Sequence, residues 1–263
     1  MSGAKRSTAT NRRRALPFRP RTDGDRRMKD DSPLALLLAH GSPSDPAPQE
    51  QAIAALAARV AALAPGWRLR GATLAAPGAL EAAVAPGAVV YPLFMSDGWF
   101  VSRETPRRLA LAGAGDARIL PPLGLDARLP ALCARRAVAA ARAAGYDVAQ
   151  TALILAAHGS PKDPRPARAA RDAAQAIALL APFRSVTACF VEEQPLLAEG
   201  LAAPGPAICL PFFAIRAGHV TGDLPEAVAE TRFSGPVLDP IGCDAEIAAL
   251  IAATLADAAF PVA

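Results

Sequence analysis

The sequence is poor in cysteine and in aromatic residues, and it has no long apolar run. Its 263 residues include four cysteines and only 5% aromatic residues. The cysteines form no C-x-x-C pair, which argues against zinc knuckles, thioredoxin-type dithiols and dense iron–sulfur ligand sets. No apolar run reaches the roughly 18 residues of a membrane helix. The Arg-rich start also lacks the apolar stretch of a secretory signal. We therefore expect a soluble cytoplasmic protein.

The common phosphate-binding loops are also missing, since neither G-x-x-x-x-G-K-[ST] nor G-x-G-x-x-G occurs. What is present is a hydrophobic fraction of 52%, much of it alanine, and a charged fraction of 20%. This composition excludes disorder of the whole chain. It predicts alanine-rich helices over a modest aliphatic core, in one large domain or two small ones.

The positive charge is concentrated at the start of the chain. Residues 1–31 contain ten Lys or Arg and four Asp, a net charge of +6, whereas the other 232 residues have a net charge of −2. We predict a disordered basic tail over 1–31. A nucleic-acid-binding arm is the alternative, but the tail has no aromatic interleaving beyond Phe18, and we expect no nucleic-acid partner. A start at Met28 would remove nearly all of the excess charge.

The remaining chain contains an internal duplication. Leu36–Pro46 recurs as Ile154–Pro164 at an offset of 118 residues, and Pro92–Pro106 recurs as Pro211–Pro225 at an offset of 119. Matches in the same order at nearly the same offset indicate two copies of one unit. We place an N-terminal half at 32–146 and a C-terminal half at 147–263.

Each half alternates short apolar runs with segments of helical spacing. The predicted strands are Leu34–Ala39, Leu69–Leu74, Ala88–Phe94, Arg118–Leu120, Ala152–Ala156, Val186–Val191, Ala207–Phe213 and Val237–Leu238. The predicted helices are Pro48–Leu63, Ala79–Val84, Glu104–Leu111, Arg128–Ala144, Ala167–Leu180, Leu196–Leu201, Pro225–Thr231 and Ala245–Ala259. Such alternation predicts an α/β fold of two tandem flavodoxin-like subdomains, each with a doubly wound parallel sheet.

Polar residues follow three predicted strands of the C-terminal half. In a sheet of order 2-1-3-4, the carboxyl ends of strands 1, 2 and 3 meet at one crevice. His158 follows the first strand, Glu192 and Glu193 follow the second, and His219 lies beyond the third. Imidazole and carboxylate groups suit a borderline divalent metal such as Co²⁺, Fe²⁺ or Ni²⁺. The sequence therefore predicts a functional site in this half, with His158 and His219 as metal ligands.

The N-terminal half retains less of this pattern. It has His40, but Phe100 stands at the position of His219, and the repeat matches the two glutamates with Leu74 and Ala75. We therefore expect a degenerate crevice in which His40 is a structural residue bonded to nearby backbone.

The motifs resemble those of a known family. An apolar strand ending in A-H-G-S, followed about fifty residues later by P-F-F-A-I-R-A-G-H-V-T-G-D-L-P, is similar to the class II tetrapyrrole chelatases. The likeness is to the sirohydrochlorin cobaltochelatases and ferrochelatases in their long, two-copy form, and it spans residues 34–258. The resemblance implies ATP-independent insertion of Co²⁺ or Fe²⁺ into sirohydrochlorin or a related tetrapyrrole, in cobalamin or siroheme biosynthesis, with the metal as substrate and no permanently bound cofactor.

The resemblance also assigns roles to residues. His158 and His219 would bind the metal or take pyrrole protons, assisted by Glu192 or Glu193, between which the sequence does not choose. Long forms often keep the working histidine pair in the first half, and Phe100 departs from that pattern. Sirohydrochlorin is a polycarboxylate, so cations and hydroxyls beside the motifs would bind it. These candidate substrate-binding residues are Lys162, Arg165, Arg216, Arg103 and Ser160.

Two other functions compete with a chelatase. A histidine-dependent phosphatase would need an arginine before its histidine, and both repeats have alanine there, at Ala39 and Ala157. A non-catalytic carrier of metal or tetrapyrrole is compatible with a degenerate half. Because one chain supplies both halves, the protein would act as a monomer or a homodimer.

Overall fold

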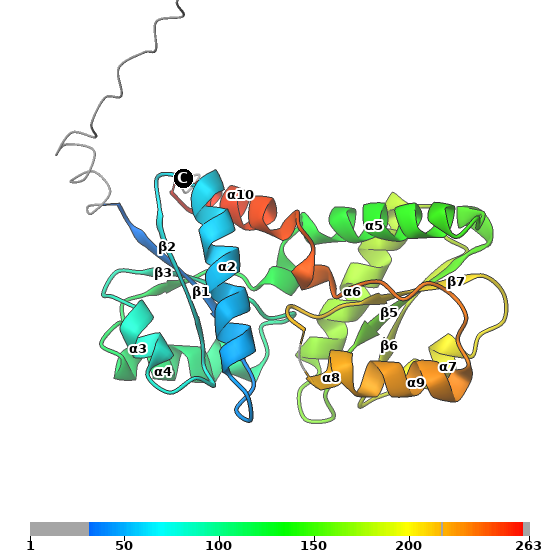
Figure 1. Ribbon diagram of the computed structural model, residues 1–263, viewed down its shortest axis with the longest axis horizontal. Helices are drawn as coiled ribbons and strands as arrows, with labels where there is room; N and C mark the ends of the chain where they lie inside the picture. Colours follow the sequence, from blue (N-terminus) through cyan, green and yellow to red (C-terminus); the bar gives the residue numbers. More distant parts are fainter. Residues whose placement is uncertain (1–31, 217, 260–263) are drawn as a thin grey trace, which may run out of the picture. The chain divides into compact units, whose positions relative to one another are not determined.

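The computed structural model describes residues 32–216 and 218–259, except for the side chain of His219. The predicted tail at 1–31 thus lies outside the described residues. From Ser32 onward the chain forms a single compact unit. Figure 1 shows its two sheets, each with helices packed on it. In the described part no helix is long and apolar enough to cross a membrane.

The first sheet is parallel and has the predicted 2-1-3-4 order, β2-β1-β3-β4. Its strands are β1 (Leu34–Ala39), β2 (Arg68–Thr73), β3 (Val89–Pro92) and β4 (Arg118–Ile119). Its helical segments are α2 (Ala47–Leu63), α3 (Ala79–Ala83), the π-helix η1 (Phe100–Glu104), α4 (Thr105–Leu111), the short turn η2 (Leu123–Leu125) and α5 (Leu129–Ala143). Alternate residues of β1 face opposite layers. Leu37 packs toward α2, whereas Leu36 packs toward α3 and α4.

The second sheet repeats this order as β6-β5-β7, also parallel. Its strands are β5 (Ala152–Ala157), β6 (Ser185–Phe190) and β7 (Ala207–Pro211). Around them lie η3 (Val148–Gln150), α6 (Arg165–Leu180), α7 (Leu197–Leu201), α8 (Gly218–Thr221), α9 (Asp223–Thr231), η4 (Ile241–Cys243) and α10 (Ile247–Ala259). The fourth strand predicted at Val237–Leu238 is only an isolated bridge from Val237 to Cys209. The nearby prolines Pro236 and Pro240 lack the amide hydrogens that a longer ladder requires.

The last helix of each half packs on the other half. Helix α5 contacts α6 and β7, and α10 contacts α2. Two polar contacts repeat this exchange: Arg136 on α5 binds Asp244, and the Thr254 hydroxyl on α10 donates to Asp126 at 2.5 Å. Thr254 lies 118 residues after Arg136, and Asp244 lies 118 residues after Asp126, so the two contacts occupy matching positions of the repeat. One apolar cluster also runs through both halves. The boundary at residue 146 therefore remains a proposal about the two copies in the sequence. In the structure, α5 and α10 each pack on the half to which they do not belong.

The two copies share one more pair of matching segments, which was not identified from the sequence. P-L-G-L-D at 122–126 recurs as P-I-G-C-D at 240–244, again 118 residues apart. A Cβ on Gly124 would lie 2.0 Å from the carbonyl oxygen of Met95, and one on Gly242 would lie 2.1 Å from that of Ala214. Only glycine permits this approach. The two turns thereby hold the loops that follow β3 and β7, which lead to the candidate site.

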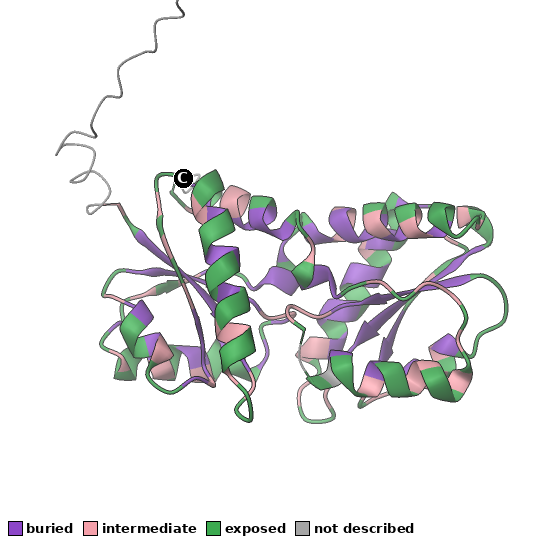
Figure 2. Cartoon of the chain, in the orientation of Figure 1, coloured by how far each residue is buried: buried purple, intermediate pink, exposed green. Residues whose placement is uncertain are grey.

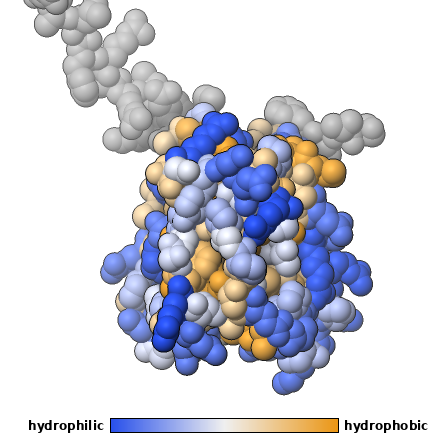
Figure 3. Space-filling view, turned by 90° about the vertical axis from the view of Figure 1, so that its right-hand side faces the viewer, coloured by the Kyte–Doolittle hydropathy of each residue, from blue (hydrophilic) through white to orange (hydrophobic). Residues whose placement is uncertain are grey.

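Burial follows the expected layering. Strands β1 and β5 are buried along their whole length, whereas the helices keep an exposed face (Figure 2). Fully buried strands are typical of parallel sheets with helices on both faces. Seen from the side of the second sheet, hydrophilic residues cover most of the surface, and apolar residues appear in smaller areas between them (Figure 3).

Candidate functional site

The carboxyl ends of β5 and β6 bring two of the predicted residues together. His158 directly follows β5, and Glu192 lies two residues beyond β6, its amide hydrogen-bonded to the carbonyl of His158. Helix α8, which contains His219, follows β7, the other neighbour of β5. Because parallel strands end at the same edge of a sheet, the three loops share one edge. The His219 side chain itself lies outside the described part.

The His158 ring has a defined orientation. Its Nδ1 lies 2.7 Å from the carbonyl oxygen of Gly159 and 3.7 Å from Oε2 of Glu192. A carbonyl oxygen only accepts hydrogen bonds, so Nδ1 carries the proton, and in the neutral ring the lone pair is on Nε2. The side chains of His158 and Glu192 are 37% and 45% exposed, respectively. Both side chains are thus partly exposed, and Nε2 is the ring nitrogen whose lone pair can bind a metal or a proton.

The neighbouring Glu193 is engaged elsewhere. Its Oε2 accepts the backbone amide of Ser160 at 3.0 Å, and its Oε1 accepts Arg171 at 2.9 Å. Its side chain also fills the space beside Gly159, where a Cβ would lie 2.7 Å from Glu193 Cγ. The structure therefore leaves Glu192, rather than Glu193, as the carboxylate beside the imidazole.

Arg171 is a site-supporting residue that the sequence analysis missed. It also donates to the carbonyl of Gln194 at 3.0 Å, and its guanidinium lies 4.8 Å from the centre of the Phe190 ring. It therefore anchors the loop that carries both glutamates. Its position in α6, beyond the repeated motif that ends at Pro164, gave no signal. Only the packing of α6 against β6 brings it to this loop.

The N-terminal half keeps the histidine geometry without the carboxylate. Nδ1 of His40 lies 2.7 Å from the carbonyl oxygen of Gly41, as expected for a histidine bonded to backbone. His158 makes the same contact, so this bond does not distinguish the two halves. What differs is the neighbour, because the Phe100 ring lies edge-on to His40 with centroids 4.4 Å apart.

One sequence match in this half needs correction. The amide that bonds to the carbonyl of His40 belongs to Ala75, so Ala75, and not Leu74, occupies the backbone position of Glu192. The strand pairing explains the shift: β2 and β6 correspond at an offset of 117 residues, whereas Pro77 and Pro195 match at 118, so the second half has one additional residue between the strand and this proline. The conclusion that this half lacks the carboxylate is unchanged.

Arg165, a predicted substrate-binding cation, is largely committed to the protein. It donates to both carboxylate oxygens of Asp163, and its Nη1 donates to the carbonyl of Asp97 at 2.9 Å and the hydroxyl of Ser102 at 3.0 Å. The Arg165 guanidinium also holds the pKa of Asp163 below its usual value. Arg165 therefore joins the loop after β5 to the segment after β3.

The other predicted substrate-binding residues differ in how far they are engaged. Arg216 pairs with Asp239, and both side chains are exposed. Ser160 accepts the amide of Lys162 at 3.3 Å. The side chains of Lys162 and Arg103 are exposed, and within the described residues neither has an ion-pair partner. These two remain the cations most accessible to an anionic ligand.

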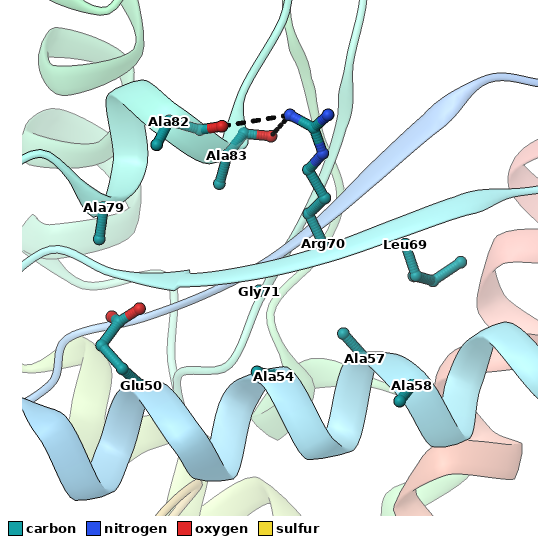
Figure 4. Close-up of a pocket in the computed structure, with 10 residues that line it drawn as sticks. All are labelled: Glu50, Ala54, Ala57, Ala58, Leu69, Arg70, Gly71, Ala79, Ala82 and Ala83. Atoms are coloured by element: carbon teal, nitrogen blue, oxygen red, sulfur yellow. Dashed lines mark hydrogen bonds between the residues drawn. The ribbon is translucent and has the colours of Figure 1, made fainter. Parts of the chain in front are cut away.

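One cavity of the described region lies away from these residues. It has a volume of about 440 Å³ and lies among α2, β2 and α3 (Figure 4). Its polar groups are used internally: Arg70 donates to the carbonyls of Ala82 and Ala83, and Glu50 accepts the amide of Thr73. We therefore assign this cavity no ligand, and the candidate site is the strand edge around His158.

Metal-binding groups are sparse in the part of the chain that the structure describes. No three His, Cys, Asp or Glu side chains cluster there in a way that would hold a metal ion. The His158–Glu192 pair supplies two donors, and His219 follows the adjacent strand. Cys189 and Cys209, expected to be buried hydrophobic residues, are buried, and burial raises their pKa values to about 11 and about 12. Thiolate ligands are therefore not provided by these strands.

Comparisons with known proteins agree with this arrangement. The family model described as CbiX matches residues 152–258. A CbiX protein, described as the terminal enzyme of siroheme biosynthesis in denitrifying bacteria, is 50% identical to this chain. The match covers 85% of this chain and 98% of that one, with a TM-score of 0.80. No curated protein sequence matches the chain.

More distant structures share the fold. SirB from Bacillus subtilis, solved with Fe³⁺, is 16% identical over 87% of this chain and 96% of its own, with a TM-score of 0.70. The sirohydrochlorin chelatase SirB from B. subtilis subspecies spizizenii, solved with cobalt, is also 16% identical, with a TM-score of 0.62 over 86% of this chain and 94% of its own. Since half of the aligned residues are identical to those of a relative covered almost completely, the chain belongs to the CbiX family, among the class II tetrapyrrole chelatases that its motifs resemble.

Proposed function

We propose that this protein inserts a divalent metal, Co²⁺ or Fe²⁺, into sirohydrochlorin or a related tetrapyrrole without ATP, in siroheme or cobalamin biosynthesis. The observation that supports this most is the exposed His158–Glu192 pair, with 3.7 Å between Nδ1 and Oε2, at the edge where β5, β6 and β7 end. The 50% identity to a CbiX protein supports the same reaction.

The chain's residues suit the two demands of metal insertion, which are removal of water from the ion and removal of two protons from the pyrrole nitrogens. In this proposal His158 binds the metal or accepts a pyrrole proton through Nε2, and His219 has the complementary role. Glu192 lies on the Nδ1 side of the His158 ring, where its carboxylate offsets the charge of the protonated imidazole. Because it is exposed, it also relays the proton to solvent. Glu193 holds the loop through Ser160 and Arg171 and is a positioning residue.

The acidic periphery of the tetrapyrrole would be bound by the exposed cations. Lys162 lies in the loop that follows β5, and Arg103 lies on the π-helix η1, which follows β3 in the chain. Arg165, Arg216 and Ser160 remain candidates for the same role. We assign Arg165 chiefly to joining the two loops, because most of its donors are occupied. The protein would act in the cytoplasm as a monomer or a homodimer.

Metal insertion followed by absorbance tests the proposal. Sirohydrochlorin is incubated without ATP, with Co²⁺ and, anaerobically, with Fe²⁺, and wild type is compared with His158→Ala, His219→Ala and His40→Ala. We expect turnover by wild type and His40→Ala and loss of turnover in the other two variants. The relative rates with the two metals rank them as substrates.

A carrier would give a different result. If wild type binds metal or pigment stoichiometrically and never exceeds the uncatalysed rate, the chelatase proposal is wrong and a non-catalytic carrier takes its place. Equal loss of turnover in all three histidine variants would instead contradict the assignment of the reaction to the second half.

A further inference from the structure

An exposed aromatic cluster occupies the degenerate half-site. The Phe100 ring lies 5.1 Å from Trp99, 6.1 Å from Phe94 and 4.4 Å from His40, measured between ring centroids. Trp99 is 53% exposed and Phe100 is 37% exposed. Single exposed apolar residues are ordinary, but adjacent aromatic rings that pack on one another and still face solvent form a surface suited to binding.

This cluster lies next to the second half-site. Gly98, which precedes Trp99, is so close to the loop after β5 that a Cβ on it would lie 3.5 Å from Oδ2 of Asp163. Arg165 fastens the same two segments through the carbonyl of Asp97 and the hydroxyl of Ser102. The aromatic rings are therefore held beside the segment that begins at His158, with four residues between His158 and Asp163.

The aromatic residues stand where the repeat has small and polar ones. The residues that match Trp99 and Phe100 in the second half are Gly218 and His219. The first half thus has two large rings where the second has a glycine–histidine pair, and Ala75 where the second has Glu192. The result is an exposed pair of aromatic rings at one half-site, edge to face at 77°, and a polar donor pair at the other.

We propose that Trp99 and Phe100 form the aromatic surface against which the flat ring of the tetrapyrrole packs, with the face of one side-chain ring and the edge of the other meeting it, so that the degenerate half-site positions the macrocycle. This inference rests on the proposed chelatase function. A conjugated macrocycle presents an apolar face that stacks on aromatic rings, and its carboxylates need cations at its rim. Arg103, an exposed residue of the π-helix η1 that begins at Phe100, supplies such a cation. The two rings are positioning residues and take no part in the proton transfers.

Binding of metal-free sirohydrochlorin, followed by the change in its absorbance spectrum, tests the proposal together with steady-state kinetics. We expect Trp99→Ala to raise the Kd and the KM for the pigment about tenfold, since a stacking contact contributes roughly this much. The kcat should stay unchanged, because the contact is made equally in the ground state and the transition state. Trp99→Phe should restore most of the affinity, because it keeps a ring.

A matched control is Leu111→Ala, which removes a 71% exposed apolar side chain at the C-terminal end of α4. It should leave the Kd unchanged. Phe100→Ala is the second variant, and circular dichroism establishes that each variant is folded. An unchanged Kd in folded Trp99→Ala and Phe100→Ala, with wild type still turning over, would overturn the inference alone. Absence of turnover by wild type would instead contradict the chelatase function.

Self-association is the other use of such a surface. Sedimentation of wild type and Trp99→Ala, each without pigment, distinguishes self-association from pigment binding. If Trp99→Ala changes the oligomeric state and leaves pigment affinity as it was, the surface binds a second copy of the chain and the proposal is wrong.

Discussion

At the scale of single residues, the two consecutive glutamates after β6 have different surroundings. Glu192 faces His158 and is exposed, whereas Glu193 is bound by Arg171 and by the amide of Ser160. We expect Glu192→Gln to lower kcat by about 10²–10⁴-fold, the usual contribution of a positioned acid–base group. It should leave the thermal unfolding midpoint unchanged. Insertion rates and melting curves of the same preparations check this.

The matched variant is Glu193→Gln, which loses its ion pair with Arg171. It should lower the unfolding midpoint more than Glu192→Gln and reduce kcat less. The reverse order of the two kcat values would show that Glu193 is the acid. The sequence could not make this distinction, because two adjacent carboxylates differ only in the directions of their side chains.

The pair formed by Arg165 and Asp163 makes stability depend on pH. Hydrogen bonds from Arg165 lower the pKa of Asp163 in the folded protein. Its contribution is therefore complete above the unfolded pKa of about 3.9 and is lost as the pH falls through the lower folded value. We expect Arg165→Met to be less stable than wild type at pH 7, with the difference shrinking below about pH 4. Urea unfolding at both pH values measures this, and a difference independent of pH would contradict it.

At the scale of elements, the strands and the three strand ends were predictable from apolar runs and their spacing, whereas the 2-1-3-4 strand order was a hypothesis adopted from flavodoxin-like sheets, and the structure confirms it. The sequence did not reveal the turns at Gly124 and Gly242, whose requirement for glycine comes from a backbone carbonyl far along the chain. It also overestimated the strand at Val237–Leu238, and it gave the helix at Pro225–Thr231 without the separate α8 that carries His219. The local pattern of apolar residues predicts whether a segment is a strand or a helix. Where the segment ends depends on contacts with backbone that is distant in sequence.

These turns allow a direct test. Gly124→Ala and Gly242→Ala should each destabilise the protein by about 1–3 kcal/mol, because the new methyl group displaces the loop after β3 or β7. Gly66→Ala is the control, since a Cβ there meets nothing within 4 Å. Urea denaturation gives the free energies of unfolding. Equal stability of all three variants would show that the loops move aside at no cost.

At the scale of the whole molecule, the exchange of α5 and α10 links the stability of the two halves. The Thr254 hydroxyl on α10 bonds to the buried Asp126, and one apolar cluster spans both sheets. We expect Thr254→Val to cost about 1.5–3 kcal/mol, the value for a hydrogen bond to a charged group. Unfolding should also remain a single transition when followed by tryptophan fluorescence and by circular dichroism. Two separate transitions would show that the halves unfold independently.

The exchanged helices also bear on how the two half-sites came to differ. A symmetric pair of identical copies that swap their last helices would carry every substitution twice, so a phenylalanine facing one histidine would face the other as well. Joining the copies in one chain removes that restriction, and each half-site then diverges alone while the shared core still requires both. A fused pseudo-dimer can thus give up one reactive centre and retain its surface for another task, which is the situation of Phe100 beside His40.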